Sequence, residues 1–443
     1  MKISLITARI DPFISPHDMN GGCVLVRNYI KALHKLGHDI HVFTRLDKYS
    51  SENSKRTNTK AEMQKEAGVG KVRVNKRLTI YRLPYEPLKS KTWQEQVQES
   101  ASFLRNVKTY FDAEKFDIYH YFHLLSLAGW ILLDGDLPYL SKTTFSPLLL
   151  TVGREFEFPP QERIDFEMEV IRKVPAISCQ SMGEMNTIRT EYKITDDKLI
   201  HIPLGVDTEI FYAKKDIMQL ENNGKTILIS PNTIKHQKRQ IEVIRTANKI
   251  KERGHRIVTV FMGRVREQEY LEEMSSLIGS LRMTLWDSQD VPSRMEILST
   301  DKDFIYIPGK KEKVLADLIR SGDIAVFPST DEGFGLLNLD CMACGTLPVC
   351  TNLKAYEDYL VAGENAIVVD KNRGWEGFVE AIDSLLKDKQ RLVSLSKIAV
   401  NSSQKYSWDN LIRKQIFVYT TLYDKAQIEP AKYHEQNWIN LND

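Results

Sequence analysis

The chain has 443 residues, more than one hydrophobic core usually serves, so we expect two domains. Its 61 Lys and Arg residues nearly balance its 59 Asp and Glu residues, and the resulting formal net charge of +2 argues against broad nucleic-acid binding. Five cysteines are few and odd in number for this length, which argues against a disulfide framework and favours a reducing compartment.

The amino-terminal apolar run ends at Arg9 and is too short for a signal peptide, so it predicts a first strand over Ile3 to Thr7. The longest apolar stretch elsewhere, Leu124 to Leu133, is well below the ~18 residues that a membrane span needs. We therefore expect a soluble, cytoplasmic protein without an integral membrane segment, while peripheral membrane contact stays open.

Strand-like and helix-like segments then alternate, which is typical of βαβ units and largely parallel sheets. The helical spacing from Cys23 to Leu36 is closed by Gly37. The other elements expected in this half are strands over Asp39 to Thr44, Val72 to Leu83, Asp117 to Tyr121, Pro175 to Gln180 and His201 to Pro203, a helix over Gln94 to Phe111, and a polar loop over Lys48 to Gly70.

The pattern restarts after a charged stretch that lacks periodicity, so we predict a first domain over residues 1–205, a linker over 206–224 and a second domain over 225–405. Two doubly wound α/β domains are expected, and open parallel sheets bind ligands at the carboxyl ends of their strands. The elements expected in the second domain are strands over Lys225 to Ser230, Ile257 to Met262, Phe304 to Ile307, Ile324 to Pro328, Leu347 to Cys350 and Ala366 to Val369, and a helix over Arg239 to Gly254.

The stretch STDEGFGLLNLDCMACGTLPV, from Ser329 to Val349, opens with carboxylates and glycines directly after a predicted buried strand. A helix should begin near Gly335 and end at Gly345, so DEGFG is a strand-to-helix turn. Its glycines let backbone amides approach a ligand, and the positive end of the helix points there.

Glu332 beside these amides offers hydrogen-bond acceptors and donors together, which is what the hydroxyls and oxygens of a sugar need. Asp340 lies about a turn and a half inside the helix, from which it could reach the same ligand. The alternative makes Glu332 a helix N-cap and Asp340 a solvent-facing acid, and this pattern alone does not decide between them.

Several ordered motifs resemble those of family 4 glycosyltransferases. Residues Glu332 to Val349 are similar to the nucleotide-sugar signature EGFGLxxLEAMACGxPV. The resemblance covers nearly the whole chain, with further matches at Gly21-Gly22, Leu36 to Val42 (LGHDIHV), Ile202 to Phe211 (IPLGVDTEIF, similar to the linker IPNGVDxxxF) and Ser407-Trp408.

This resemblance implies a GT-B fold, in which two Rossmann-like domains face an interdomain cleft. It puts the acceptor on the side of residues 1–205, the nucleotide-sugar donor on the side of 225–405, and a closing helical segment over 406–443 that crosses back to the first domain. It also implies a retaining, metal-independent enzyme that moves a sugar from a UDP- or GDP-sugar to a hydroxyl acceptor, with the nucleotide sugar as co-substrate and no cofactor.

Carried over position by position, the resemblance assigns Glu332 and the turn of Gly333, Phe334, Gly335 and Leu336 to the donor sugar and its phosphates. Asp340 matches a glutamate that binds the nucleotide ribose and is one methylene shorter. Gly309, in FIYIPGKKEK, resembles a turn at which backbone groups meet the nucleobase.

The leaving diphosphate needs cations or amides, because negative charge develops on it. The family loop GRLxxxKG corresponds to SPNTIKHQKRQ, in which Lys238 matches the lysine and Thr233 stands at the arginine position. Either Lys235 or Arg239 supplies the second positive charge, or Lys238 and the loop amides are sufficient. Without the family resemblance, this group of basic residues would be interpreted as a solvent-exposed face of a helix. The amides at Gly21 and Gly22 could contact the same diphosphate.

The family's first-domain histidine has no match, because Phe145 and Ser146 stand in its place. His120, His123 and Arg154 are candidate acceptor contacts, with ordinary structural roles as the alternative. Cys341-x-x-Cys344 lacks the partners that a zinc site needs.

Two other functions stay open. One is a nucleotide-sugar-binding protein that lost catalysis through the departures at Asp340, Thr233 and Phe145. The other is a GT-B nucleotide-sugar epimerase, against which the EGFGL signature argues.

Overall fold

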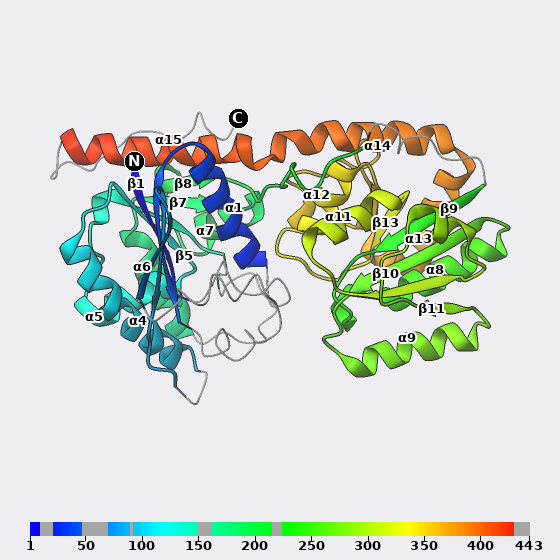
Figure 1. Cartoon of the computed structure of the whole chain (residues 1–443), viewed down its shortest axis with the longest axis horizontal. Helices are drawn as coiled ribbons and strands as arrows, with labels where there is room; N and C mark the ends of the chain where they lie inside the picture. Colours follow the sequence, from blue (N-terminus) through cyan, green and yellow to red (C-terminus); the bar gives the residue numbers. More distant parts are fainter. Residues whose placement is uncertain are drawn as a thin grey trace. The chain divides into compact units, whose positions relative to one another are not determined.

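The computed structural model describes residues 1–8, 21–46, 70–88, 92–148, 150, 161–214 and 224–428, which form two compact units (Figure 1). The first unit comprises Met1–Pro203 and the chain from Asp409 onward, and the second comprises Leu204–Trp408. The chain therefore leaves the first unit, builds the second without interruption, and returns. Val206 and Ser407 pair as an isolated parallel bridge, so the two ends of the second unit lie side by side.

The sheet of the first unit has the strand order β3-β4-β2-β1-β5-β6-β7-β8, and every pair is parallel except β3 with β4. Its apolar strands are buried on both faces, as parallel strands usually are. The order reverses between β1 and β5, which is the switch point of a doubly wound sheet. The strands are β1 (Lys2–Thr7), β2 (Asp39–Arg45), β3 (Gly70–Asn75), β4 (Leu78–Leu83), β5 (Ile118–Phe122), β6 (Thr143–Ser146), β7 (Ala176–Cys179) and β8 (Leu199–His201).

One sequence expectation is wrong here, because the single strand predicted over Val72 to Leu83 is an antiparallel hairpin of β3 and β4. The side chain of Asn75 accepts a hydrogen bond from the backbone N–H of Arg77 at 2.9 Å, and this closes the turn. Asn favours such turns through this local bond.

Helices pack on both faces of the first sheet (Figure 1). On one face α4, α5 and α6 pack together, and on the other α1 and α15 meet through a hydrogen bond from Tyr29 to Gln415. The helices are α1 (Gly21–Lys35), α4 (Trp93–Ala113), α5 (Leu125–Asp134), α6 (Gln161–Lys173), α7 (Met182–Thr190) and α15 (Trp408–Ile428).

The apolar run around Leu124 to Leu133 forms α5, whose residues from Leu125 to Trp130 are buried in the core of the first unit. Within the described ranges, no helix has both the length and the apolar character needed to cross a membrane.

The sheet of the second unit is parallel throughout, with the order β11-β12-β10-β9-β13-β14-β15. Its switch point lies between the neighbours β9 and β13, so the loops after these two strands emerge side by side. The strands are β9 (Lys225–Ser230), β10 (Arg256–Gly263), β11 (Leu285–Asp287), β12 (Phe304–Pro308), β13 (Ile324–Phe327), β14 (Leu347–Thr351) and β15 (Ile367–Val369).

The helices of the second unit form two packed groups, α8 with α9 and α13, and α12 with α11 and α14 (Figure 1). Each group covers one face of the sheet, and the structure confirms the two predicted doubly wound α/β folds. The helices are α8 (Gln240–Glu252), α9 (Gln268–Ser280), α10 (Arg294–Ser299), α11 (Glu312–Ser321), α12 (Leu336–Cys344), α13 (Gly374–Lys387) and α14 (Lys389–Ser403).

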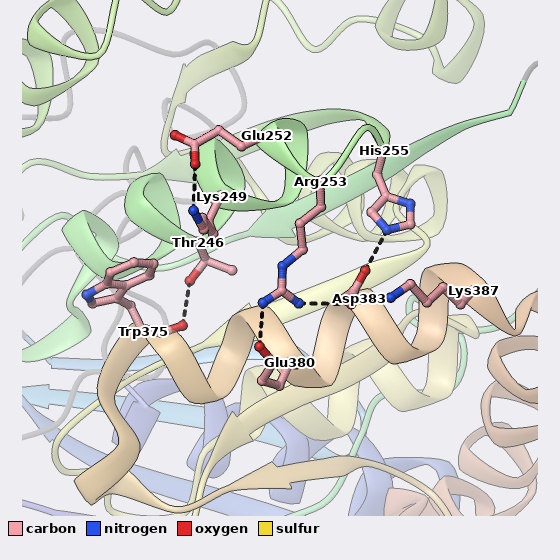
Figure 2. A network of polar contacts seen from close by, with 9 residues as sticks. All are labelled: Thr246, Lys249, Glu252, Arg253, His255, Trp375, Glu380, Asp383 and Lys387. Carbon is pink, nitrogen blue, oxygen red and sulfur yellow. Dashed lines mark hydrogen bonds and ion pairs between the residues drawn. The ribbon is translucent and has the colours of Figure 1, made fainter.

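A polar network joins the end of α8 to α13, with Asp383 at its centre (Figure 2). The carboxylate of Asp383 is buried and accepts hydrogen bonds from Lys387 at 2.8 Å, His255 at 2.7 Å and Arg253 at 2.8 Å. These bonds lower the pKa of Asp383 to about 2, although burial opposes them. The network therefore stabilises the packing of α8 on α13 only while this carboxylate is ionised.

Replacing Asp383 by asparagine should destabilise the second unit by ~2 kcal/mol at neutral pH, because a carboxylate bonded to charged donors is lost. The folded pKa lies below the unfolded value of about 3.9, so the stabilisation is complete above that value and fades as the pH falls toward 2. Calorimetric unfolding of wild type and D383N between pH 7 and about pH 3 should show a difference that shrinks with acidification.

Glu380→Gln is the matched control, because Glu380 pairs with Arg253 but its side chain is half-exposed. This variant should unfold close to the wild-type temperature at every pH. A pH-independent difference for D383N would contradict the role of the ionised carboxylate.

Candidate functional site

The two loops at the switch point of the second sheet bring opposite charges together. The loop after β9 carries Lys238, and the loop after β13 carries Glu332. The Nζ of Lys238 donates to the carboxylate of Glu332, and the two side chains are only 12% and 17% exposed. The sequence analysis named both residues, and the structure brings them together at the edge where open parallel sheets bind ligands.

Backbone contacts hold the two loops against each other. The N–H of Thr330 donates to the carbonyl of Gln237 at 3.1 Å, and the side-chain amide of Gln237 donates to the carbonyl of Asp331 at 2.7 Å. The hydroxyl of Thr351, at the end of β14, donates to the carbonyl of Ser329 at 2.6 Å. The position of Glu332 is therefore fixed from both sides of the turn.

The acid–glycine turn ends in the N-terminus of α12. Gly335 is the N-cap residue and has left-handed backbone angles, with φ at 79°, while Gly345 closes the same helix with φ at 84°. Both helix ends are as the sequence predicted, but the N-cap alternative for Glu332 is wrong. Left-handed Gly335 followed by right-handed Leu336 forms a concave set of N–H groups that suits an anion. The N–H groups of Gly335 and Leu336 donate to no other part of the chain that the structure describes.

Two tyrosines pack beneath this turn. A Cβ atom on Gly335 would overlap the ring of Tyr356 and lie 2.9 Å from the hydroxyl of Tyr359. The hydroxyl of Tyr359 donates a bifurcated hydrogen bond to the carbonyls of Phe334 and Gly335, with both oxygens at 2.9 Å. The turn is thus held tightly by the two tyrosines through its carbonyl groups.

Asp340 lies in the second turn of α12 and is half-buried, so the alternative of a solvent-facing acid is wrong. Burial raises its pKa well above the usual value, and the nearby charges of Glu312 and Asp207 raise the pKa further. Across the described ranges, its carboxylate has no hydrogen-bond or ion-pair partner. A ribose contact for Asp340 stays a prediction.

The remaining residues of the β9 loop are engaged locally. The Nζ of Lys235 donates to the side chain of Gln237, and Arg239 pairs with Glu242 one turn further along. Arg239 also has left-handed angles, with φ at 51°, at the position where the related loop has glycine. The carbonyl of Thr233 accepts from the side chain of Gln240 at 2.9 Å. The ion-pair partner of Glu332 is Lys238, whereas Lys235 and Arg239 bond to Gln237 and Glu242.

Arg264 is a cation at the same edge that the sequence analysis missed. It follows β10, and its carbonyl accepts the N–H of Ile234, which joins the loops after β9 and β10. Gly309 lies against it, since a Cβ on Gly309 would be 2.9 Å from the Cγ of Arg264. The available signal was two arginines, in Gly263-Arg264-Val265-Arg266, directly after a predicted strand.

In the first unit, His120 is fully buried. Its Nδ1 lies 2.6 Å from the hydroxyl of Tyr419 and its Nε2 lies 2.9 Å from that of Ser146, and burial lowers its pKa to about 3. It is a neutral packing residue that connects β5 to α15. Direct contact with an acceptor would require the ring to leave both partners.

His123 lies just past the carboxyl end of β5, beside the switch point of the first sheet, and is half-buried with φ at 70°. Its Nδ1 accepts the N–H of Leu125 at 3.1 Å, where α5 begins. Gly21 and Gly22 are the first two residues of α1 rather than a turn before it. Arg154 lies outside the described residues.

Cys341 and Cys344 are buried thiols of α12, and burial raises the pKa of both. Among the residues that the structure describes, no group of three or more His, Cys, Asp or Glu side chains is arranged to hold a metal ion.

Comparison with known proteins adds two family matches that together cover most of the chain. Residues 19–210 match the model described as Glycosyltransferase Family 4, and residues 213–402 match the model described as Glycosyl transferases group 1. A curated relative, the D-inositol 3-phosphate glycosyltransferase of Corynebacterium aurimucosum, is 21% identical over 92% of this chain and 93% of its own length.

Solved structures with the same architecture include a sucrose-phosphate synthase from Thermosynechococcus elongatus. It has a TM-score of 0.73 and 17% identity, with 96% of this chain and 99% of that one covered. HepE of Anabaena, solved in complex with UDP, has a TM-score of 0.68 and 12% identity, with 95% and 100% covered. At this identity the likeness concerns the fold, and together with the two largely parallel α/β sheets it establishes the GT-B architecture.

Gly335→Ala should destabilise the second unit strongly. The left-handed angle alone costs ~1–2 kcal/mol for a residue with a side chain, and the added methyl group would overlap Tyr356. Gly333→Ala is the matched control, because its Cβ would meet open space and its φ is not left-handed. The unfolding temperature should fall strongly in G335A and hardly at all in G333A. An equal fall in both variants would contradict the tight packing under Gly335.

Proposed function

Because the chain belongs to glycosyltransferase family 4, we propose that it transfers a sugar from a nucleoside-diphosphate sugar to a hydroxyl acceptor with retention of configuration. That it is a glycosyltransferase follows from the family. The donor class and the stereochemistry are the proposal. The observation that carries it is the meeting of Lys238 and Glu332 beside the N-terminal amides of α12.

Lys238 is proposed to stabilise the leaving diphosphate. Its side chain is only 12% exposed, and electrostatic contacts are stronger where water is largely excluded. The N–H groups of Gly335 and Leu336 add uncharged donors, and the positive end of α12 favours an anion at the same place. Thr233 stands where the family loop has an arginine, and we propose that Lys238 and these amides together replace that arginine. Arg264 lies at the same edge of the sheet as a further cation.

Glu332 is proposed to bind hydroxyls of the donor sugar. In the structure its carboxylate is paired with Lys238. When a diphosphate attracts Lys238, the carboxylate is freed to accept hydrogen bonds from sugar hydroxyls. The pair thus keeps two largely buried charges neutralised until the donor arrives, since an unpaired buried charge is costly.

The proposed reaction takes place on one face of the sugar. The bond between the anomeric carbon and the diphosphate oxygen breaks, and a bond from the acceptor oxygen to the same carbon forms. The leaving phosphate accepts the proton of the acceptor hydroxyl, so no protein base is required. Lys238 and the amides stabilise the charge that develops on the phosphate, a contribution that exists mainly in the transition state.

A UDP-sugar is one of the two donors we propose, and the complex of HepE with UDP supports it; a GDP-sugar is the other. The second unit is proposed to bind the donor, with Asp340 on the ribose and Gly309 beside the base. The first unit is proposed to bind the acceptor, with His123 the best placed of its candidate residues, because it follows a strand at the switch point. Arg154 and the amides at Gly21 and Gly22 remain candidates.

Lys238→Met and Glu332→Gln should each reduce kcat by ~10²–10³-fold, because each removes an interaction with the reacting donor. Each single variant leaves an unpaired charge and should also lower the unfolding temperature. The double variant K238M/E332Q removes both charges, so it should regain stability while staying inactive. Release of UDP or GDP with an acceptor present measures turnover.

The control is Lys249→Met, which breaks a half-exposed lysine–glutamate pair on α8 outside the proposed machinery. This variant should keep full activity. Full activity in both K238M and E332Q would contradict the assignment of the site.

A thermal-shift screen over UDP, GDP, ADP and their sugars should single out one nucleotide, because a ligand that binds only the folded state raises the apparent stability. Product analysis separates the other functions. A binding protein without catalysis would be stabilised but release no nucleotide, and an epimerase would change the sugar without an acceptor.

A further inference from the structure

Tyr359 lies in the connection between β14 and β15, and its own backbone is held rigidly. The side-chain amide of Asn365 donates to the carbonyl of Tyr359 at 2.9 Å, and Asn365 accepts the N–H of Val361 at 2.7 Å. Ala362 and Ala366 form a parallel bridge in the same segment. The fully buried ring of Tyr359 is therefore carried by a small, internally bonded loop.

The hydroxyl of Tyr359 reaches the acid–glycine turn from a position 24 residues beyond Gly335. Its oxygen lies 2.9 Å from the carbonyl oxygens of both Phe334 and Gly335, so its single proton is shared between them in a bifurcated hydrogen bond. Burial raises the pKa of this hydroxyl well above its usual value, so it stays protonated and remains a donor at any working pH.

The geometry of the peptide bond links these carbonyls to the amides of Gly335 and Leu336. In a trans peptide the C=O of one residue and the N–H of the next point in opposite directions. The carbonyl of Phe334 shares a peptide plane with the N–H of Gly335, and the carbonyl of Gly335 shares one with the N–H of Leu336. A donor that holds both carbonyls on one side consequently holds both N–H groups on the other side.

We infer that Tyr359 is a positioning residue that orients the amides of Gly335 and Leu336 toward the diphosphate of the donor. This inference rests on the proposed function of the same site. The tyrosine does not touch the ligand; it fixes two peptide planes that do. A preorganised pair of amides stabilises an anion without having to reorient when the anion arrives.

Tyr359→Phe tests the inference, because it removes the hydroxyl and keeps the ring that packs 5.0 Å from Phe334. Tyr406→Phe is the matched control: its ring lies 6.1 Å from Tyr359, and its hydroxyl donates to the carbonyl of Asp358, outside the turn. Calorimetry with UDP and GDP identifies the nucleotide that the wild type binds, and ligand-observed NMR measures the matching nucleoside without phosphates.

Y359F should bind that nucleoside diphosphate ~10-fold more weakly, an effect of the size expected when a buried hydrogen bond is lost. Its affinity for the nucleoside should be unchanged, and Y406F should match the wild type for both ligands. In the free enzyme, hydrogen exchange of the Asn338 amide, which donates to the carbonyl of Gly335 at 2.9 Å, should be faster in Y359F only.

Wild-type affinity for the diphosphate in Y359F would overturn the inference and leave the proposed function intact. An equal loss of affinity for the diphosphate and the nucleoside in Y359F would also overturn the inference. So would an unchanged rate of hydrogen exchange at the Asn338 amide. If the wild type binds neither UDP nor GDP, the proposed function fails, and the role of Tyr359 toward a ligand fails with it.

Discussion

A lysine and a glutamate meet at the carboxyl edge of the second sheet, where water scarcely reaches them. Removing two charges from water costs several kcal/mol per ion, so their attraction stabilises the protein only if the geometry is held. The parallel pairing of β9 with β13 places the two loops side by side, and the contacts of Gln237 with Thr330 and Asp331 keep them there. The candidate site therefore depends on three features together: the order of the strands, the hydrogen bonds between the two loops, and the ion pair of Lys238 with Glu332.

The site relies more on backbone than the family loop suggests. Threonine stands at the arginine position, and Lys235 and Arg239 are occupied by Gln237 and Glu242. In the proposed donor site, the uncharged N–H groups at the start of α12 would therefore contribute a larger share of the binding of the diphosphate. Such groups lose no side-chain entropy, but they act only if their peptide planes are fixed. The packing of Tyr356 and Tyr359 under the turn meets that requirement.

Local patterns predicted the parts of the fold whose causes are local. Apolar runs in the sequence predicted buried strands such as Ile324–Phe327. The preference for glycine at a left-handed helix end predicted that a helix ends at Gly345. Lys238 and Glu332 were identified through their motifs, which are also local. The hydrogen bond from Tyr359 to the carbonyl of Gly335 joins residues 24 positions apart, and no local sequence pattern predicts it. The burial of His120 could not be predicted for the same reason, because its partner Tyr419 lies 299 residues away. The hairpin of β3 and β4 was missed because only two residues, Lys76 and Arg77, separate the strands within an otherwise strand-like run.

The connectivity of the first unit has a consequence for how the protein is made. Its helix α15 supplies Gln415 and Tyr419 to buried hydrogen bonds with Ser178 and His120, yet these residues leave the ribosome after the whole second unit. The second unit is continuous in sequence and can fold as soon as it emerges. The first must wait during synthesis with polar groups of its sheet uncovered, although it is translated first. Completion of the amino-terminal half thus requires the synthesis of α15, and a chain interrupted after residue 408 would have a complete second unit and an incomplete first unit.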